Sequence, residues 1–197
     1  METTFNEKDS LRVITEMIEN SKSNLKDNSF FYLLWGWLVL IASVTNFVLL
    51  KMGYYELSWI PWAVLMSGGG IVSGIAGHRL GKKAKAKTMF DTTMSFLWGG
   101  FVITLFIILF TAGSGNLTWK ASNIMIIALY GLGTFVSGGL LKFKPLIIGG
   151  GFSWAIAVAT IFIPELYSLL MVALSIIVAY LVPGYMLKSK EKSQGHV

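Results

Sequence analysis

Residues 30–50 read FFYLLWGWLVLIASVTNFVLL, a run of 21 residues without a charged side chain. An α-helix rises about 1.5 Å per residue, so this run is about as long as the roughly 30 Å hydrocarbon layer of a bilayer is thick. Lipid offers no hydrogen-bond partners to an open strand, and the run lacks the alternation of a half-buried strand. The stretch therefore predicts a transmembrane helix.

Five further apolar runs of similar length follow this one. They cover residues 59–78, 93–112, 122–141, 145–163 and 166–187. Of the 197 residues, 54% are apolar and 13% are charged, which is about half the charge of an average soluble domain. The sequence predicts an all-α, polytopic membrane helix bundle. Six transmembrane helices are expected over residues 29–188, followed by a polar tail over residues 189–197.

The first 28 residues are polar and differ from the rest of the chain. Leu11, Ile14, Ile18 and Leu25 recur at helical intervals, with charged residues on the other faces. The segment has no secretory-signal pattern, so the first apolar run is expected to stay as a membrane helix. Residues 1–28 predict an N-terminal amphipathic helix, which either lies on the membrane surface or docks on the cytoplasmic ends of the bundle.

Basic residues predict the orientation of the six helices. With the N-terminus inside, all of the 16 lysines and arginines except Lys51 and Lys120 fall on the cytoplasmic side. Cytoplasmic loops carry such an excess of basic residues. The net charge of +6 is thus explained by topology, and no nucleic-acid partner is expected. The sequence predicts a multi-pass protein of the cell membrane with both termini in the cytoplasm.

Short patterns recur among the predicted spans. The odd spans share a Trp, a small residue and a Val four positions after the Trp, at Trp35, Trp98 and Trp154. The even spans share a Val, one residue and a Gly, at residues 72–74, 136–138 and 182–184. Either the chain consists of three repeated hairpins related by an axis along the membrane normal, or these residue types coincide by chance because they are common in membrane helices.

Small residues mark candidate surfaces for helix packing. These candidates are Gly70, Gly74, Gly77, Gly133 and Ser137. Small residues three or four positions apart let membrane helices approach closely, either within one chain, which we favour, or across a dimer face. For the triplet Gly149–Gly151, close packing is favoured over a helix that is unwound to bind a substrate.

Residues that carry chemistry are scarce in the spans. The sequence contains no cysteine, paired carboxylate, phosphate loop or metal-ligand motif, so we expect no enzyme activity, cofactor or metal. No ionisable residue lies in the middle of a span, which speaks against proton coupling. The polar residues at depth are expected to bond to the helix backbone or to a neighbouring helix; they are Thr45, Asn46, Thr104, Asn123, Ser137, Ser153, Thr160 and Ser175.

A cytoplasmic basic cluster follows the second span. It consists of Arg79, Lys82, Lys83, Lys85 and Lys87. Such a cluster attracts anionic lipid at about 1 kcal/mol per basic residue, or a protein partner. Its role as a topology determinant would be sufficient to explain it.

The order EKDSLRVITEMIENSK over residues 7–22, then FFYLLWGW over residues 30–37, resembles a group of uncharacterised bacterial six-helix membrane proteins. The resemblance covers most of the chain but includes no catalytic motif, so no functional residue is carried over. It implies a bacterial inner membrane. Because such proteins often accompany small winged-helix regulators, it also implies a role in stress or envelope maintenance.

Two functions remain open at this stage. The first is a non-enzymatic membrane protein, a sensor or accessory, that acts through a cytoplasmic partner bound by residues 1–27 or by the basic cluster; it predicts a closed bundle. The alternative is a small transporter or permease for a neutral or amphipathic solute, which predicts a polar or hydrated cavity near the midplane. The sequence leaves the oligomeric state open.

Overall fold

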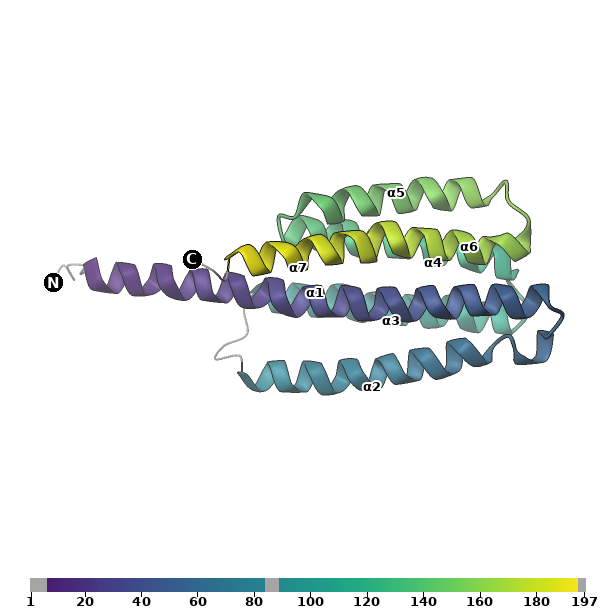
Figure 1. Ribbon diagram of the computed structural model, residues 1–197, viewed down its shortest axis with the longest axis horizontal. Coiled ribbons are helices and arrows are strands. Elements are labelled where there is room, and N and C mark those ends of the chain that lie inside the picture. Colours follow the sequence, from purple (N-terminus) through teal and green to yellow (C-terminus); the bar gives the residue numbers. More distant parts are fainter. Residues whose placement is uncertain (1–6, 84–88, 195–197) are drawn as a thin grey trace.

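The computed structural model describes residues 7–83 and 89–194, with side chains described for residues 29–79, 82 and 89–190. Within these ranges the chain is helical and contains no strand. The elements are α1 (Glu7–Lys51), the 3₁₀ turn η1 (Tyr55–Leu57), α2 (Ile60–Lys83), α3 (Met89–Gly113), α4 (Trp119–Leu140), α5 (Lys144–Thr160), α6 (Glu165–Ile176), the π-helical turn η2 (Ile177–Leu181) and α7 (Val182–Gln194). The helices run up and down one long axis, and the start of α1 and the end of α7 lie at the same end of the bundle (Figure 1).

Among the described residues, five helices are long and apolar enough to cross a membrane. They cover Ser29–Lys51, Tyr55–Arg79, Met89–Gly113, Trp119–Leu140 and Glu165–Lys190. This finding supports a multi-pass membrane protein. The run predicted over residues 145–163 forms the 17-residue helix α5, which rises only about 25 Å, so the predicted count of six spans is not confirmed. The structure likewise does not confirm the threefold repeat.

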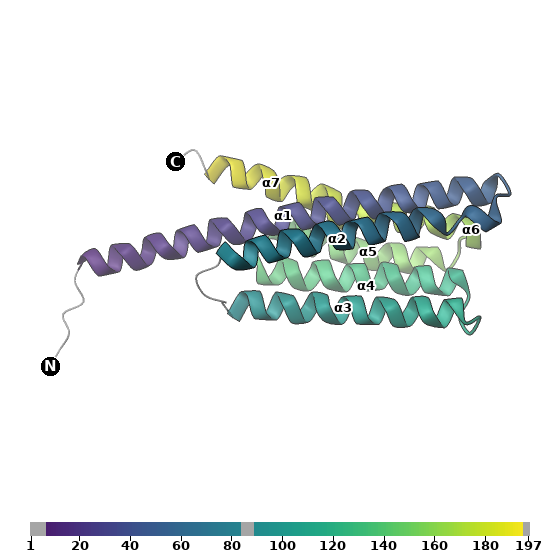
Figure 2. The same cartoon turned by 90° about the horizontal axis from the view of Figure 1, so that it is seen from below.

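The N-terminal segment differs from its prediction. Residues 7–28 are helical, but they continue without a break into the first span, so α1 has 45 residues. Its N-terminal part extends along the bundle axis past the other helices (Figure 2) instead of folding back onto them. The side chains of residues 1–28 lie outside the described residues, so the predicted amphipathic character stays a prediction.

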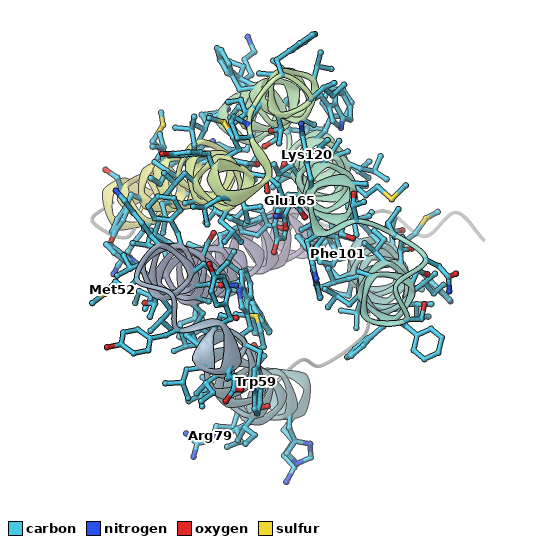
Figure 3. The ribbon with its side chains drawn as sticks, turned by 90° about the vertical axis from the view of Figure 1, so that its right-hand side faces the viewer. Met52, Trp59, Arg79, Phe101, Lys120 and Glu165 are labelled. Carbon is cyan, nitrogen blue, oxygen red and sulfur yellow. The ribbon has the colours of Figure 1, made fainter. Side chains whose placement is uncertain are left out.

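The packing divides the helices into two groups that share α6 and η2. Helix α1 contacts α2, α6, η2 and α7, and helix α4 contacts α3, α5 and α6. Among the described residues, α2 packs substantially only on α1, and no comparable contact joins it to α3. At the end of the bundle opposite the termini, the Lys120 ammonium donates a hydrogen bond of 2.8 Å to the Ile161 carbonyl oxygen, which ties α4 to the connection after α5 (Figure 3).

Close backbone contact explains the glycine triplet of α5. A Cβ built on Gly150 would lie 2.7 Å from the carbonyl oxygen of Gly131 in α4, and one on Gly149 would lie 2.8 Å from the carbonyl oxygen of Val178 in η2. Real Cβ atoms do not approach backbone so closely, and α5 is not unwound here. The prediction that the triplet admits neighbouring helices is confirmed at these two positions, whereas Gly151 faces open space.

Just before Pro183, the last apolar helix is interrupted by a π-helical turn. The Val182 N–H donates to the Ile177 carbonyl, five residues back, instead of four as in an α-helix. Proline has no N–H with which to continue the α-helical pattern. The turn carries Tyr180, whose side chain is buried at 3% exposure.

Most polar side chains at depth find partners, as predicted. Thr104 and Thr160 donate to carbonyl oxygens four residues back in their own helices. The Ser153 and Ser175 hydroxyls share a hydrogen bond of 2.8 Å between α5 and α6, and Asn123 donates to Ser168 over 2.7 Å between α4 and α6. The prediction is wrong for Ser137 and for the amide oxygen of Asn46, which are buried without a hydrogen-bond partner.

Candidate intramembrane binding cleft

A cleft of about 460 Å³ lies between the pair α1 and α2 on one side and the pair α3 and α4 on the other. Residues of α6 and η2 close it toward the bundle interior. Seven of its lining side chains are aromatic: Phe31, Tyr32, Trp35, Trp98, Phe101, Tyr130 and Tyr180. None of the described residues that line the cleft is charged. The volume lies within the roughly 300–1,000 Å³ of typical small-molecule sites.

Helical periodicity places these side chains on common faces. In α3, the lining residues Met94, Trp98, Phe101 and Leu105 are three or four positions apart and so lie on one face of the helix. In α1, Tyr32, Trp35 and Val39 recur in the same way. All three α1 residues belong to the half of the span nearer the termini. The cleft therefore lies in that half of the bundle and reaches toward its middle.

Tyr180 forms the centre of an aromatic cluster at the base of the cleft. Its ring meets Tyr32 and Tyr130 edge-to-face at centroid distances of 5.5 and 5.4 Å, and Trp98 at 6.2 Å. Phe101 stacks on Tyr130 at 5.6 Å. Edge-to-face and offset arrangements contribute about 0.5–1.5 kcal/mol per pair beyond the burial of area. The base is thus a rigid, preformed surface that joins α1, α3, α4 and η2.

Several hydroxyl groups around this cluster lack partners. The Tyr32 and Tyr180 hydroxyls are buried without a hydrogen bond, as are those of Ser73 on the cleft wall and of Ser137 in α4. The Tyr32 and Ser137 hydroxyls approach one another, but not in hydrogen-bonding geometry. Leaving a buried hydroxyl unpaired costs about 1–3 kcal/mol. The cleft is therefore apolar and aromatic, unlike the polar or hydrated cavity expected of a permease, with unpaired hydroxyls at its base.

Two of the five predicted packing residues lie beside this cluster. A Cβ on Gly133 would lie 3.4 Å from both Phe101 and Trp98, so the backbone of Gly133 packs against these two aromatic side chains. Ser137 lies one helical turn further along α4, next to Tyr32.

The other three predicted packing residues lie elsewhere. A Cβ built on Gly70, Gly74 or Gly77 would meet no atom within 4 Å, so this face of α2 has no neighbour among the described residues. Gly69 instead faces α1, where a Cβ would lie 2.5 Å from Leu38. Of the two interpretations offered above, packing within the chain therefore finds no support at these three glycines. A dimer face stays a prediction.

The basic cluster is remote from the cleft. Arg79 and Lys82 are exposed near the end of α2 on the side of the termini, and Figure 3 shows Arg79 at the periphery of the bundle. The side chains of Lys83, Lys85 and Lys87 lie outside the described residues. His78 is also exposed, as expected for an interfacial residue.

Tyr32, Tyr130 and Tyr180 are not among the residues predicted from the sequence, because only charged and small residues in the spans were taken as candidates. Their depth in the spans could have identified them, since tyrosine normally lies at the membrane interface, where its hydroxyl meets water. Tyr130 is eleven residues into the 22-residue helix α4. A tyrosine at that depth needs a polar partner inside the bundle.

The arrangement can hold an apolar or amphipathic molecule by dispersion and ring stacking. Val102 is 46% exposed on α3 and lines the cleft, so the cleft is reached from the side between α2 and α3.

A comparison of the chain with protein-family models, curated proteins and solved structures finds no match.

Proposed function

We propose that this protein binds a neutral or amphipathic small molecule in its aromatic cleft, as a membrane sensor or as a small transporter of lipid-soluble molecules. The observation that carries this proposal is the cleft itself, since bundles that serve only as anchors gain nothing from an open volume of about 460 Å³. Packing defects of this size forfeit dispersion contacts, so an open volume needs an occupant. The proposed activity is non-enzymatic.

The way α2 packs supports a route from the bilayer into the cleft. Among the described helices, α2 packs substantially only on α1, and the face of α3 toward it includes the exposed residues Ser95 and Val102. Figure 3 looks along the bundle and shows Phe101 of α3 facing the space between α3 and the pair α1 and α2. A lipid-soluble molecule would enter here without crossing the ends of the bundle.

The orientation stays as the basic residues predict it. We propose a bacterial inner-membrane location with both termini in the cytoplasm, which agrees with the termini lying at one end of the bundle (Figure 1). The cleft would then occupy the cytoplasmic half of the membrane.

The test is native mass spectrometry of the full-length protein released from membranes under mild conditions. Val102→Phe places a larger side chain on the wall of the cleft and narrows it, whereas Val158→Phe makes the same change on α5, where Val158 is 59% exposed and does not line the cleft. We expect a small molecule bound to the wild type and to Val158→Phe but missing from Val102→Phe. If none of the three proteins retains a bound molecule, the proposal is refuted.

A second candidate function is action through a cytoplasmic protein partner. It is favoured by the N-terminal part of α1, which extends past the bundle and so presents a free helix (Figure 2). The partner would bind residues 1–27 or the basic cluster. Replacing Leu11 and Ile18 by Asp on the predicted apolar face should remove a copurifying protein, whereas Asn20→Asp with Ser23→Asp on the opposite face should retain it. Equal recovery from both variants would refute this function.

A further inference from the structure

We infer that the ligand is a neutral aromatic molecule with a carbonyl-type hydrogen-bond acceptor, whose ring lies among the aromatic side chains of the cleft and whose acceptor reaches the hydroxyls of Tyr32 and Tyr180. This inference rests on the proposed function, because it names the ligand class for that same cleft. Three properties of the cleft support it in turn.

The ligand is neutral because the cleft offers no countercharge. None of the described lining residues is charged, and the surroundings are lipid and apolar side chains. An unpaired ion in such surroundings costs at least several kcal/mol, and cation–π contacts return only about 2 kcal/mol or somewhat more when desolvated. The aromatic walls alone therefore do not compensate for the burial of a charge.

We infer an aromatic ligand because aromatic side chains form the walls of the cleft. Trp98 and Phe101 are tilted against one another at 5.1 Å on α3, and both are only partly buried, so their remaining surface faces the cleft. Trp35 on α1 lines the opposite side and is also partly buried. A flat ring inserted here gains offset or edge-to-face contacts with several aromatic partners. A saturated chain gains only dispersion.

The acceptor follows from the unpaired hydroxyls. Tyr32 and Tyr180 are each 3% exposed, their rings meet at 5.5 Å, and both side chains line the base of the cleft. Each hydroxyl has one proton to donate, and one carbonyl oxygen has two lone pairs to accept both. Both hydroxyl oxygens are covered by neighbouring side chains. A carbonyl that reaches them when the two side chains turn toward the cleft would supply both missing partners at once. A hydrocarbon of the same shape would leave both hydroxyls unpaired.

The test uses three naphthalene probes of nearly equal size: 2-acetylnaphthalene, 2-ethylnaphthalene and 2-naphthyltrimethylammonium. Binding to full-length protein in nanodiscs is measured by equilibrium dialysis, and nanodiscs that hold Val102→Phe give the background from lipid. We expect the ketone to bind the wild type about 10-fold more tightly than the hydrocarbon, as one or two hydrogen bonds of about 1 kcal/mol each imply.

The variants Tyr32→Phe and Tyr180→Phe remove the hydroxyls and keep the rings. Each should weaken ketone binding roughly 5-fold and leave hydrocarbon binding unchanged, since one hydrogen bond is lost. Tyr167→Phe is the matched control, because Tyr167 is 44% exposed and does not line the cleft. Both cleft variants should keep the wild-type melting temperature or raise it, because they delete an unpaired buried hydroxyl.

Each other outcome overturns a defined part of the inference. Equal affinity for ketone and hydrocarbon, or unchanged ketone binding in both tyrosine variants, overturns the acceptor. Tighter binding of the cation overturns neutrality. If no probe distinguishes the wild type from Val102→Phe while native mass spectrometry still finds a molecule in the cleft, the ligand class is wrong and the proposed function stands. If both experiments find nothing in the cleft, the ligand class and the proposed function are both wrong.

Discussion

Gly149 of α5 faces the carbonyl oxygen of Val178 in the π-helical turn, and a Cβ added to Gly149 would lie 2.8 Å from that oxygen. The neighbouring Cα of Ala179 would lie 3.1 Å away. Both atoms belong to the backbone, which cannot rotate out of the way as a side chain can. This contact holds α5 against the turn that carries Tyr180, and so it connects a packing residue to the base of the cleft.

Gly149→Ala should therefore destabilise the bundle and disturb the cleft. Overpacking typically costs about 1–3 kcal/mol, and here the turn must move away from α5. We expect a lower melting temperature in detergent and weaker binding of the cleft ligand. Gly151→Ala is the matched control, since a Cβ there meets nothing within 4 Å, and it should behave as the wild type or be slightly more stable. Equal stability of the two variants would show that α5 and η2 are not in close contact.

The hydrogen bond between Ser153 and Ser175 should hold α5 and α6 together. Both side chains are fully buried, and their oxygens lie 2.8 Å apart. In a double-mutant cycle of Ser153→Ala and Ser175→Ala, we expect a coupling energy of about 0.6 kcal/mol, the average for hydrogen bonds between membrane helices. The measurement is unfolding by denaturing detergent. Thr104→Ala is the control, because Thr104 bonds only its own helix, and a coupling near zero between the serines would contradict the contact.

Hydrophobic patterning predicted the helices because it is a local property of the chain. The charge-free run over residues 30–50 lies inside α1, and each further predicted span overlaps a helix of the structure. The limits of α5 were less predictable, because the apolar residues 161–163 continue the run although the helix ends at Thr160. Pro164 and the turn before it end the helix, and hydropathy alone does not predict a turn that consists of apolar residues.

The cleft depends on contacts between residues far apart in the sequence, and sequence periodicity does not predict such contacts. Tyr32 and Tyr180 meet across 148 positions, and whether their hydroxyls find partners depends on how α1 and η2 face each other. Similarly, Gly69 and Gly70 are adjacent in sequence, yet only Gly69 faces α1. Small-residue spacing identifies a face of a helix but does not identify the helix that covers it. The sequence therefore predicted candidates for packing and missed the cleft.

Larger side chains on the two faces of α2 should affect the stability of the protein differently. Gly69→Leu collides with Leu38 and should lower the stability by about 1–3 kcal/mol, because α1 is the one helix on which α2 packs substantially. Gly74→Leu adds the same side chain in open space and should leave the stability of the single chain unchanged. Size-exclusion chromatography with light scattering of both variants reports the oligomeric state. A change caused by Gly74→Leu alone would assign the glycine face of α2 to contact with a second copy.

Cysteine labelling should decide whether α5 crosses the membrane, because the sequence contains no native cysteine. A membrane-impermeant maleimide is applied to intact cells that carry Ser114→Cys, Phe162→Cys or Ser189→Cys, all at exposed positions. If Lys144–Thr160 spans, as its course alongside α4 indicates (Figure 1), the reagent should label Ser114→Cys and Phe162→Cys but not Ser189→Cys until the cells are lysed. If α5 only re-enters, the chain crosses five times, so Phe162→Cys would be protected and Ser189→Cys labelled. That result would refute both the six-span topology and a cytoplasmic C-terminus.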